Sequence, residues 1–157
     1  MKAIYAGSFD PFTNGHLSIV KEAALLFDKV FVVLSSNSKK TRAFYKLDMF
    51  NAMNDCIARN GINNAVVVRY DGLIADLAEN LEVGYLVRGL RNTTDFMYEE
   101  EIAKFNSKLN PDLSTIYLRA KDDSISSSMV RELLSYNKDV SDLVPKEVLR
   151  VIQEKAP

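Results

Sequence analysis

The sequence is poor in the residues that build disulfides and zinc sites. It has one cysteine (Cys56), one histidine (His16) and no tryptophan in 157 residues. A single cysteine excludes a disulfide within the chain, and with one histidine it argues against a zinc site of nitrogen and sulfur ligands. We therefore expect no protein-built metal site, and Cys56 is expected to act as a small apolar residue of the core.

The sequence also lacks a dominant charge and a long apolar run. Its 20 lysines and arginines nearly balance its 21 aspartates and glutamates. No overall basic field therefore favours nucleic acid, and any anion site must be local. No stretch approaches the ~20 apolar residues that cross a membrane. We expect a cytoplasmic protein with neither a membrane nor a nucleic-acid partner.

Short apolar runs alternate with segments of helical periodicity along the whole chain. The predicted strands are residues 3–6, 30–34, 65–70, 85–87 and 115–118, and the intervening segments place apolar residues on one helical face. This alternation predicts an α/β fold, a Rossmann-like, doubly wound, parallel five-stranded sheet with helices on both faces. The length suits one domain over residues 1–157, with a core over 1–136 and a tail of two short helices over 137–157.

Polar and glycine-rich turns follow the predicted strands. Ligands of such sheets bind at the carboxyl ends of the strands. The turns there read GSFDPFTNGH (7–16), SSNSKKTR (35–42), RGLRNTTD (88–95) and KDDSISSS (121–128). All four are rich in groups that bind anions, which indicates a phosphate-binding edge of the sheet.

Each of these turns also has a purely structural interpretation. His16 could simply lie in the first turn of a capped helix, and Arg88 and Arg91 could pair with carboxylates. Ser126 could be a helix N-cap, Lys40 a solvated charge and Glu99 part of an exposed acidic helix face. The joint position of these groups on one sheet edge favours the ligand-binding interpretation.

Three motifs together resemble a known family. GSFDPFTNGH is similar to the (H/T)xGH signature of the α/β nucleotidyltransferases, and RGLRNTTDFMYE and SISSSMVRE resemble two further motifs in the same order. The match runs from Ala3 to about Pro145 and is most similar to the bacterial phosphopantetheine adenylyltransferases. The resemblance implies transfer of AMP from ATP to 4′-phosphopantetheine, giving 3′-dephospho-CoA and pyrophosphate, with Mg²⁺ as cofactor. It also implies a homohexamer and feedback inhibition by coenzyme A.

The resemblance implies roles for single residues. His16 would stabilise the transition state, with Lys40 and Arg91 as further catalytic residues, and Ser8, Lys40, Ile74 and Arg88 would bind phosphopantetheine. The implied ATP site also contains Ser8 and His16, and its other members are Phe9, Gly89, Leu90, Arg91, Glu99, Asp122, Asp123, Ser124, Ile125, Ser126, Ser127 and Ser128.

The sequence departs from the family pattern in places that leave alternatives open. The loop around SKKTRAFYKL is longer than usual, so either Lys39 or Lys40 can be the active lysine, and the loop before Ser126 is shorter. Two other functions remain possible on the sequence alone. One is another nucleotidyltransferase with the same histidine motif, such as a cytidylyltransferase or a nicotinamide mononucleotide adenylyltransferase. The other is a non-catalytic nucleotide or coenzyme A sensor.

Overall fold

The computed structural model describes residues 1–36 and 39–155, so residues 37 and 38 of the lysine-bearing turn and 156 and 157 of the tail lie outside the described residues. The elements, in chain order, are β1 (Lys2–Gly7), α1 (Asn14–Leu26), β2 (Lys29–Leu34), α2 (Lys46–Arg59), β3 (Ala65–Arg69), α3 (Ile74–Asn80), β4 (Tyr85–Leu90), α4 (Thr93–Leu109), β5 (Ser114–Arg119), α5 (Ser127–Ser135) and α6 (Lys146–Lys155).

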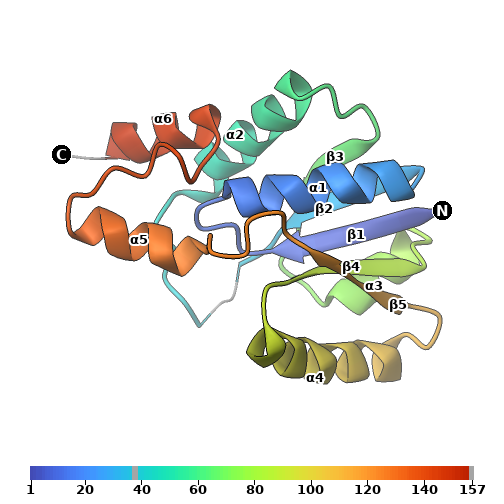
Figure 1. The fold of residues 1–157 in the computed structure, drawn as a ribbon. Coiled ribbons are helices and arrows are strands. Elements are labelled where there is room, and N and C mark those ends of the chain that lie inside the picture. Colours follow the sequence, from blue (N-terminus) through green and yellow to red (C-terminus); the bar gives the residue numbers. More distant parts are fainter. Residues whose placement is uncertain (37–38, 156–157) are drawn as a thin grey trace.

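The five strands form one parallel sheet in the order β3-β2-β1-β4-β5. The chain builds outward from β1 to β3, returns past β1, and continues in the opposite direction through β4 and β5 (Figure 1). The strand order therefore reverses between β1 and β4, and a crevice opens at their carboxyl ends, where ligands of such sheets bind. The predicted doubly wound α/β fold is confirmed.

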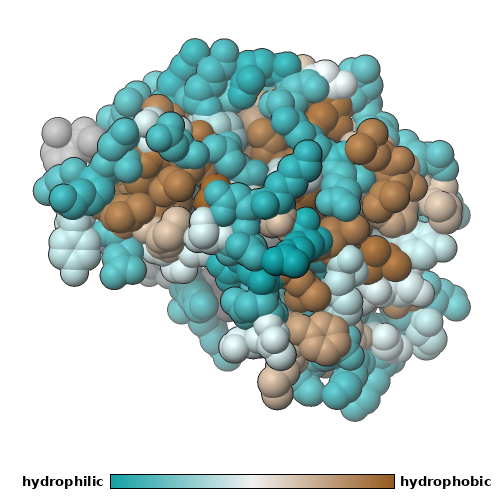
Figure 2. Space-filling view, in the orientation of Figure 1, coloured by the Kyte–Doolittle hydropathy of each residue, from teal (hydrophilic) through white to brown (hydrophobic). Residues whose placement is uncertain are grey.

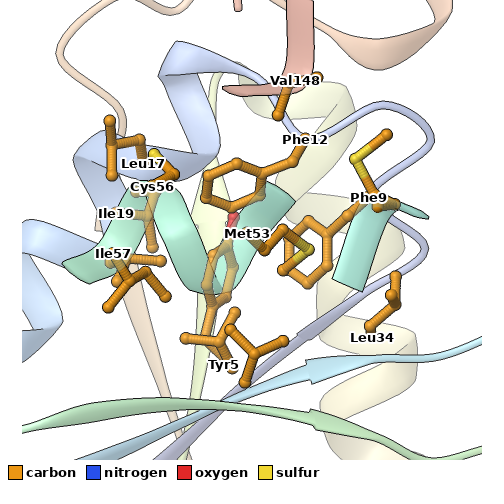
Figure 3. Close-up of a cluster of buried hydrophobic side chains, with 14 of the residues drawn as sticks. Tyr5, Phe9, Phe12, Leu17, Ile19, Leu34, Met53, Cys56, Ile57 and Val148 are labelled. Carbon is orange, nitrogen blue, oxygen red and sulfur yellow. The ribbon is translucent and has the colours of Figure 1, made fainter. Parts of the chain in front are cut away.

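Alternating side chains of β1 divide the core between the two faces of the sheet. Ala3 and Tyr5 belong to one apolar cluster, and Ile4 and Ala6 belong to the other. Helices α1 and α2 cover the first face, with α6 packed beside α2, and α3 and α4 lie across the second (Figure 1). Because both faces are covered, the central residues of β1, β2 and β3 are apolar on both sides of the sheet. Cys56 lies in the first cluster and is fully buried, as predicted (Figure 3).

Strand β4 is longer than its apolar run predicted. The sequence suggested a strand ending at Val87 followed by an RGLR turn, but β4 continues through Leu90. Its pairing with β1 ends at Val87, whereas its pairing with β5 continues to Leu90. Pairing with β5 alone thus holds the polar end of β4 in place. As a result Arg88 lies on a strand and only Arg91 lies beyond it.

The C-terminal tail contains one helix within residues 137–155, where the sequence suggested two. Residues 137–145 form turns and irregular chain, in which the Ser141 N–H donates to Asp139 Oδ1 at 3.0 Å and the Leu143 N–H to the Val140 carbonyl at 2.9 Å. Such local bonds to an aspartate compete with a helix. Between α5 and α6, brown side chains line a groove that includes Leu134, Val140 and Leu149 (Figure 2). Among the described helices, none has both the length and the apolarity to cross a membrane.

Candidate active site

The turn between β1 and α1 is anchored by two buried phenylalanines. Phe9 and Phe12 are 2% and 0% exposed, and Figure 3 shows both rings among the core side chains near Tyr5. Phe9 adopts a φ of 43°, in the left-handed region that favours glycine. The ring of Phe9 also fills the space beside Gly7, where a Cβ would come within 3.0 Å of it. The core therefore fixes the path of the backbone that presents Ser8.

His16 is held by the helix start in a defined orientation. The Thr13 N–H donates to His16 Nδ1 at 3.0 Å, and the His16 N–H donates to Thr13 Oγ1 at 3.3 Å, which together make a reciprocal cap. The ring packs edge-on against Phe9 and is stacked on Phe12. Because an amide N–H only donates, Nδ1 must be unprotonated, so the ring proton sits on Nε2. The capped helix start is present, and it leaves Nε2–H as a donor for a ligand.

Burial, together with a smaller effect of the positive charge of Arg91, lowers the pKa of His16 to about 4. The ring is therefore neutral at pH 7. In the unfolded chain the pKa returns to about 6.5, so protons favour the unfolded state once the pH falls below that value.

We expect this histidine to make folding stability sensitive to acid. The free energy of unfolding should fall by up to about 2 kcal/mol relative to a His16→Asn variant between pH 7 and pH 5. Asparagine does not titrate, and its side-chain oxygen can still accept from Thr13. Urea unfolding of both proteins at the two pH values measures this difference. Parallel pH profiles would show that His16 does not have a depressed pKa.

One cavity lies at the carboxyl ends of β1 and β4. It has a volume of about 430 Å³. The predicted ATP-site residues that line it are Ser8, Phe9, His16, Gly89, Arg91, Glu99, Ile125, Ser126, Ser127 and Ser128, and Arg88, predicted to bind phosphopantetheine, lines it as well. Leu90, Asp122, Asp123 and Ser124 do not line it. Leu90 borders a separate surface hollow next to Tyr117. Asp122 accepts from Ser124 within the loop, and Asp123 pairs with Arg119 at the end of β5, so both carboxylates are engaged by neighbouring residues.

Arg88 and Glu99 form a bidentate ion pair in the wall of the cavity. Arg88 Nε donates to Glu99 Oε2 at 2.6 Å and Nη2 to Oε1 at 2.9 Å, while Nη1 donates to the Ala6 carbonyl at 3.1 Å. Burial opposes the charge of Arg88, but the bonds and the charge of Glu99 outweigh it and raise its pKa. Three of the five guanidinium N–H groups are thus used, which leaves two for a ligand.

Arg91 faces the same cavity with a weaker restraint. Its Nε donates to Asp95 Oδ2 at 3.0 Å, one helical turn along the chain, and its side chain is 38% exposed. Pairs of this kind contribute little to stability. Arg91 can therefore exchange Asp95 for an anionic ligand at small cost.

The three serines at the start of α5 have different roles. Ser126 caps the helix by accepting from the Met129 N–H at 3.1 Å. Ser127 Oγ donates to the Pro11 carbonyl at 2.7 Å and so ties α5 to the first turn. Ser128 Oγ lies 3.2 Å from Ser126 Oγ. The helix N-terminus and these hydroxyls face the cavity, an arrangement suited to phosphate.

A second cavity of about 500 Å³ adjoins the first. It is lined by all the predicted phosphopantetheine-site residues, which are Ser8, Lys40, Ile74 and Arg88. The presence of Lys40 favours it as the active lysine. The two cavities share Ala6, Gly7, Ser8, Arg88 and Arg131. Two ligands could therefore meet beside Ser8 and Arg88.

Residues missed by the sequence analysis also line these cavities. Arg131 lines both of them and donates from Nη1 to the Asp10 carbonyl at 2.7 Å. Arg131 follows Ser127 and Ser128 by four and three positions, so helical spacing alone could have placed it on their face. Arg42 and Asp10 line the second cavity, and no local pattern indicated that they would meet.

Comparison with known proteins identifies the same family as the sequence motifs GSFDPFTNGH, RGLRNTTDFMYE and SISSSMVRE. Residues 4–133 match the family described as cytidylyltransferase-like. A phosphopantetheine adenylyltransferase of Streptococcus pyogenes is 43% identical over 153 residues, covering 96% of this chain and 93% of the relative. That of Lactobacillus gasseri is 43% identical over 156 residues, covering 98% and 93%.

A solved structure shows the same fold at low sequence identity. A Vibrio parahaemolyticus protein described as a nicotinate-nucleotide adenylyltransferase superposes with a TM-score of 0.70 at 18% identity, covering 98% of this chain and 91% of that one. At this identity the likeness concerns the fold alone. The identity to the curated relatives, over nearly the full chain, decides the family. The chain belongs to the phosphopantetheine adenylyltransferases, within the cytidylyltransferase-like nucleotidyltransferases.

Proposed function

We propose that the protein transfers the adenylyl group of ATP to 4′-phosphopantetheine, giving 3′-dephospho-CoA and pyrophosphate. The observation that carries this proposal is the junction of two cavities at Ser8 and Arg88, beside the donor nitrogen of His16. The shared name of the relatives favours this activity over cytidylyl transfer, nicotinamide mononucleotide adenylylation and a non-catalytic sensor.

The chemistry needs positioning more than acid or base catalysis. The nucleophile is already a phosphate anion, so catalysis consists of aligning two polyanions and stabilising the charge that develops. In this proposal ATP occupies the first cavity, with Arg91 and Ser126 to Ser128 at its β- and γ-phosphates. Phosphopantetheine occupies the second cavity, with Ile74 beside its arm. Ser8, Lys40 and Arg88 hold the attacking phosphate, and His16 Nε2–H donates to the α-phosphate.

Mg²⁺ enters this proposal bound to ATP. Within the described residues there is no group of three or more His, Cys, Asp or Glu side chains arranged to hold a metal. The two carboxylates that line the first cavity, Asp95 and Glu99, are engaged by Arg91 and Arg88. Residues 1–36 and 39–155 therefore provide no metal site of their own, which suits an ion held chiefly by substrate phosphates.

Turnover with defined substrates tests the function. The purified protein with Mg²⁺, ATP and 4′-phosphopantetheine should release pyrophosphate and form dephospho-CoA, detected by mass spectrometry. Turnover with another phosphate acceptor, such as nicotinamide mononucleotide, and none with phosphopantetheine would contradict the assignment.

We further propose a cytoplasmic location, where such substrates occur. We also propose feedback inhibition by coenzyme A. Coenzyme A carries the same pantetheine arm and an adenosine moiety, so it would occupy the same two cavities.

We also propose that the protein assembles as a homohexamer. Helix α4 supports this, because it exposes Phe96, Met97, Phe105 and Leu109, each between 42% and 69%. Apolar side chains gathered on one exposed element are typical of an interface. Size-exclusion chromatography with light scattering should give six copies, and a stable monomer would contradict the assembly.

Arg131 is expected to bind substrate directly. Within residues 1–36 and 39–155 it forms no ion pair with a carboxylate, although it lines both cavities. Arg131→Met should therefore lower kcat/KM by roughly 10- to 100-fold through loss of charged hydrogen bonds. Steady-state kinetics at saturating and limiting ATP measure this, with the exposed Arg150→Met as the control. Unchanged kcat/KM would assign Arg131 to the Asp10 contact alone.

A further inference from the structure

The loop that carries Lys40 is tied to the Ser8 turn by a reciprocal set of contacts centred on Arg42 and Asp10. Arg42 Nη1 donates to the Ser8 carbonyl at 2.5 Å and Nη2 to the Phe9 carbonyl at 3.3 Å. In return, the Asp10 carboxylate accepts from the backbone N–H groups of Ala43 and Phe44 at 2.8 and 3.0 Å. Each segment thus supplies one charged side chain to the backbone of the other.

These contacts are shielded from water. The Arg42 and Asp10 side chains are 15% and 11% exposed, and Arg42 Nη2 lies 3.7 Å from Asp10 Oδ1. Arg42 Nε also donates to the Phe44 carbonyl at 3.2 Å, so the guanidinium binds three carbonyls. A planar guanidinium can satisfy these acceptors together, whereas a lysine ammonium on a flexible stem cannot fix the same geometry.

The N-terminal end of the same loop is held by different contacts, which involve Asp71. The Ser36 N–H donates to Asp71 Oδ1 at 2.8 Å, and Lys46 forms an ion pair with the same carboxylate. Asp71 is 62% exposed, so this restraint is weaker than the one at Arg42. Lys40 lies two positions before Arg42, on the cavity that also contains Ser8. The Arg42 contacts therefore set how closely Lys40 approaches the Ser8 turn.

We propose that Arg42 is a positioning residue for adenylyl transfer, which acts by holding the Lys40 backbone against the Ser8 turn. The inference rests on the proposed function and on the role of Lys40 within it. Arg42 lines only the second of the two joined cavities, so its loss should affect phosphopantetheine and turnover while sparing ATP.

A double-mutant cycle tests this route of action. Arg42→Met should lower kcat/KM for phosphopantetheine by roughly 10- to 100-fold, the scale of a misplaced reacting group, with KM for ATP changed less than threefold. In a Lys40→Met background the same change should have almost no further effect. Arg150→Met, on the exposed side of α6, is the matched control and should match wild type in both backgrounds.

Several outcomes would overturn the proposal. Wild-type kinetics for Arg42→Met, an equal loss in the Lys40→Met background, or a parallel loss in both KM values would each do so. Arg42→Gln, which keeps an amide donor, serves where the methionine variant does not fold. If neither folds, Arg42 is a residue of fold stability and the proposal is wrong.

A measurement without turnover separates this proposal from the proposed function. Trypsin cleavage after Lys39 and Lys40, followed by mass spectrometry, reports opening of the loop. Arg42→Met should raise the cleavage rate at these sites at least several-fold at unchanged global stability, even if the enzyme acts on a different acceptor. Unchanged cleavage would show that Arg42 does not hold the loop.

Discussion

Replacing His16 with alanine should lower kcat by about 10²- to 10³-fold while the Kd of ATP stays within a few-fold of wild type. The reason lies in the cap at the start of α1. Thr13 donates to Nδ1 and so leaves the proton on Nε2, in a ring that burial keeps neutral at pH 7. A neutral donor held in place before the reaction binds the ground state weakly and the more highly charged transition state strongly.

The alanine variant also removes a helix-capping contact, so a second variant is needed. His16→Asn keeps an acceptor for the Thr13 N–H but does not place a donor at the position of Nε2. We expect the asparagine variant to unfold at nearly the wild-type urea concentration at pH 7 and to remain as slow as the alanine variant. Calorimetric titration of ATP and single-turnover rates separate binding from chemistry. An ATP affinity that falls as much as kcat would show that His16 binds the ground state only.

The fold was predictable because its determinants are local. The apolar runs around Ile4, Val32 and Val67 and the helical spacing between them are sufficient to indicate a covered parallel sheet. The position of the site follows from that topology, because glycine- and hydroxyl-rich turns then gather at one edge. The ends of elements were less predictable. β4 extends to Leu90 through its pairing with β5, a contact between segments that lie far apart in the sequence.

The partners of the charged residues were not predictable. Arg88 and Glu99 were each predicted to face a ligand, and the structure pairs them with each other across β4 and α4. Asp10 and Arg42 lie 32 positions apart and meet only because two turns leave the same edge of the sheet. Ion pairs of this kind depend on tertiary placement, and neither residue carries a local pattern that indicates its partner.

The Arg88–Glu99 pair leads to the second large expected effect. Arg88→Met should lower the free energy of unfolding by about 3 kcal/mol, because it leaves the Glu99 carboxylate, 11% exposed, without its counter-charge. The double variant Arg88→Met with Glu99→Gln should recover most of that loss, since a neutral amide costs far less to bury than an unpaired carboxylate. Urea unfolding at pH 7 measures both values. Independent, additive losses would show that the two side chains do not stabilise one another.

Turnover should not recover together with stability. The double variant still lacks the guanidinium whose two remaining N–H groups face the junction of the cavities, so its KM for phosphopantetheine should stay roughly 10- to 100-fold above wild type. A double variant that is both stable and fully active would assign Arg88 to the cavity wall alone.

Glu99→Gln by itself frees Arg88 from its carboxylate partner and should strengthen phosphopantetheine binding, provided that the guanidinium keeps its bond to the Ala6 carbonyl. Opposite changes in KM for Glu99→Gln and Arg88→Met would therefore identify a guanidinium that is shared between a structural carboxylate and the incoming phosphate.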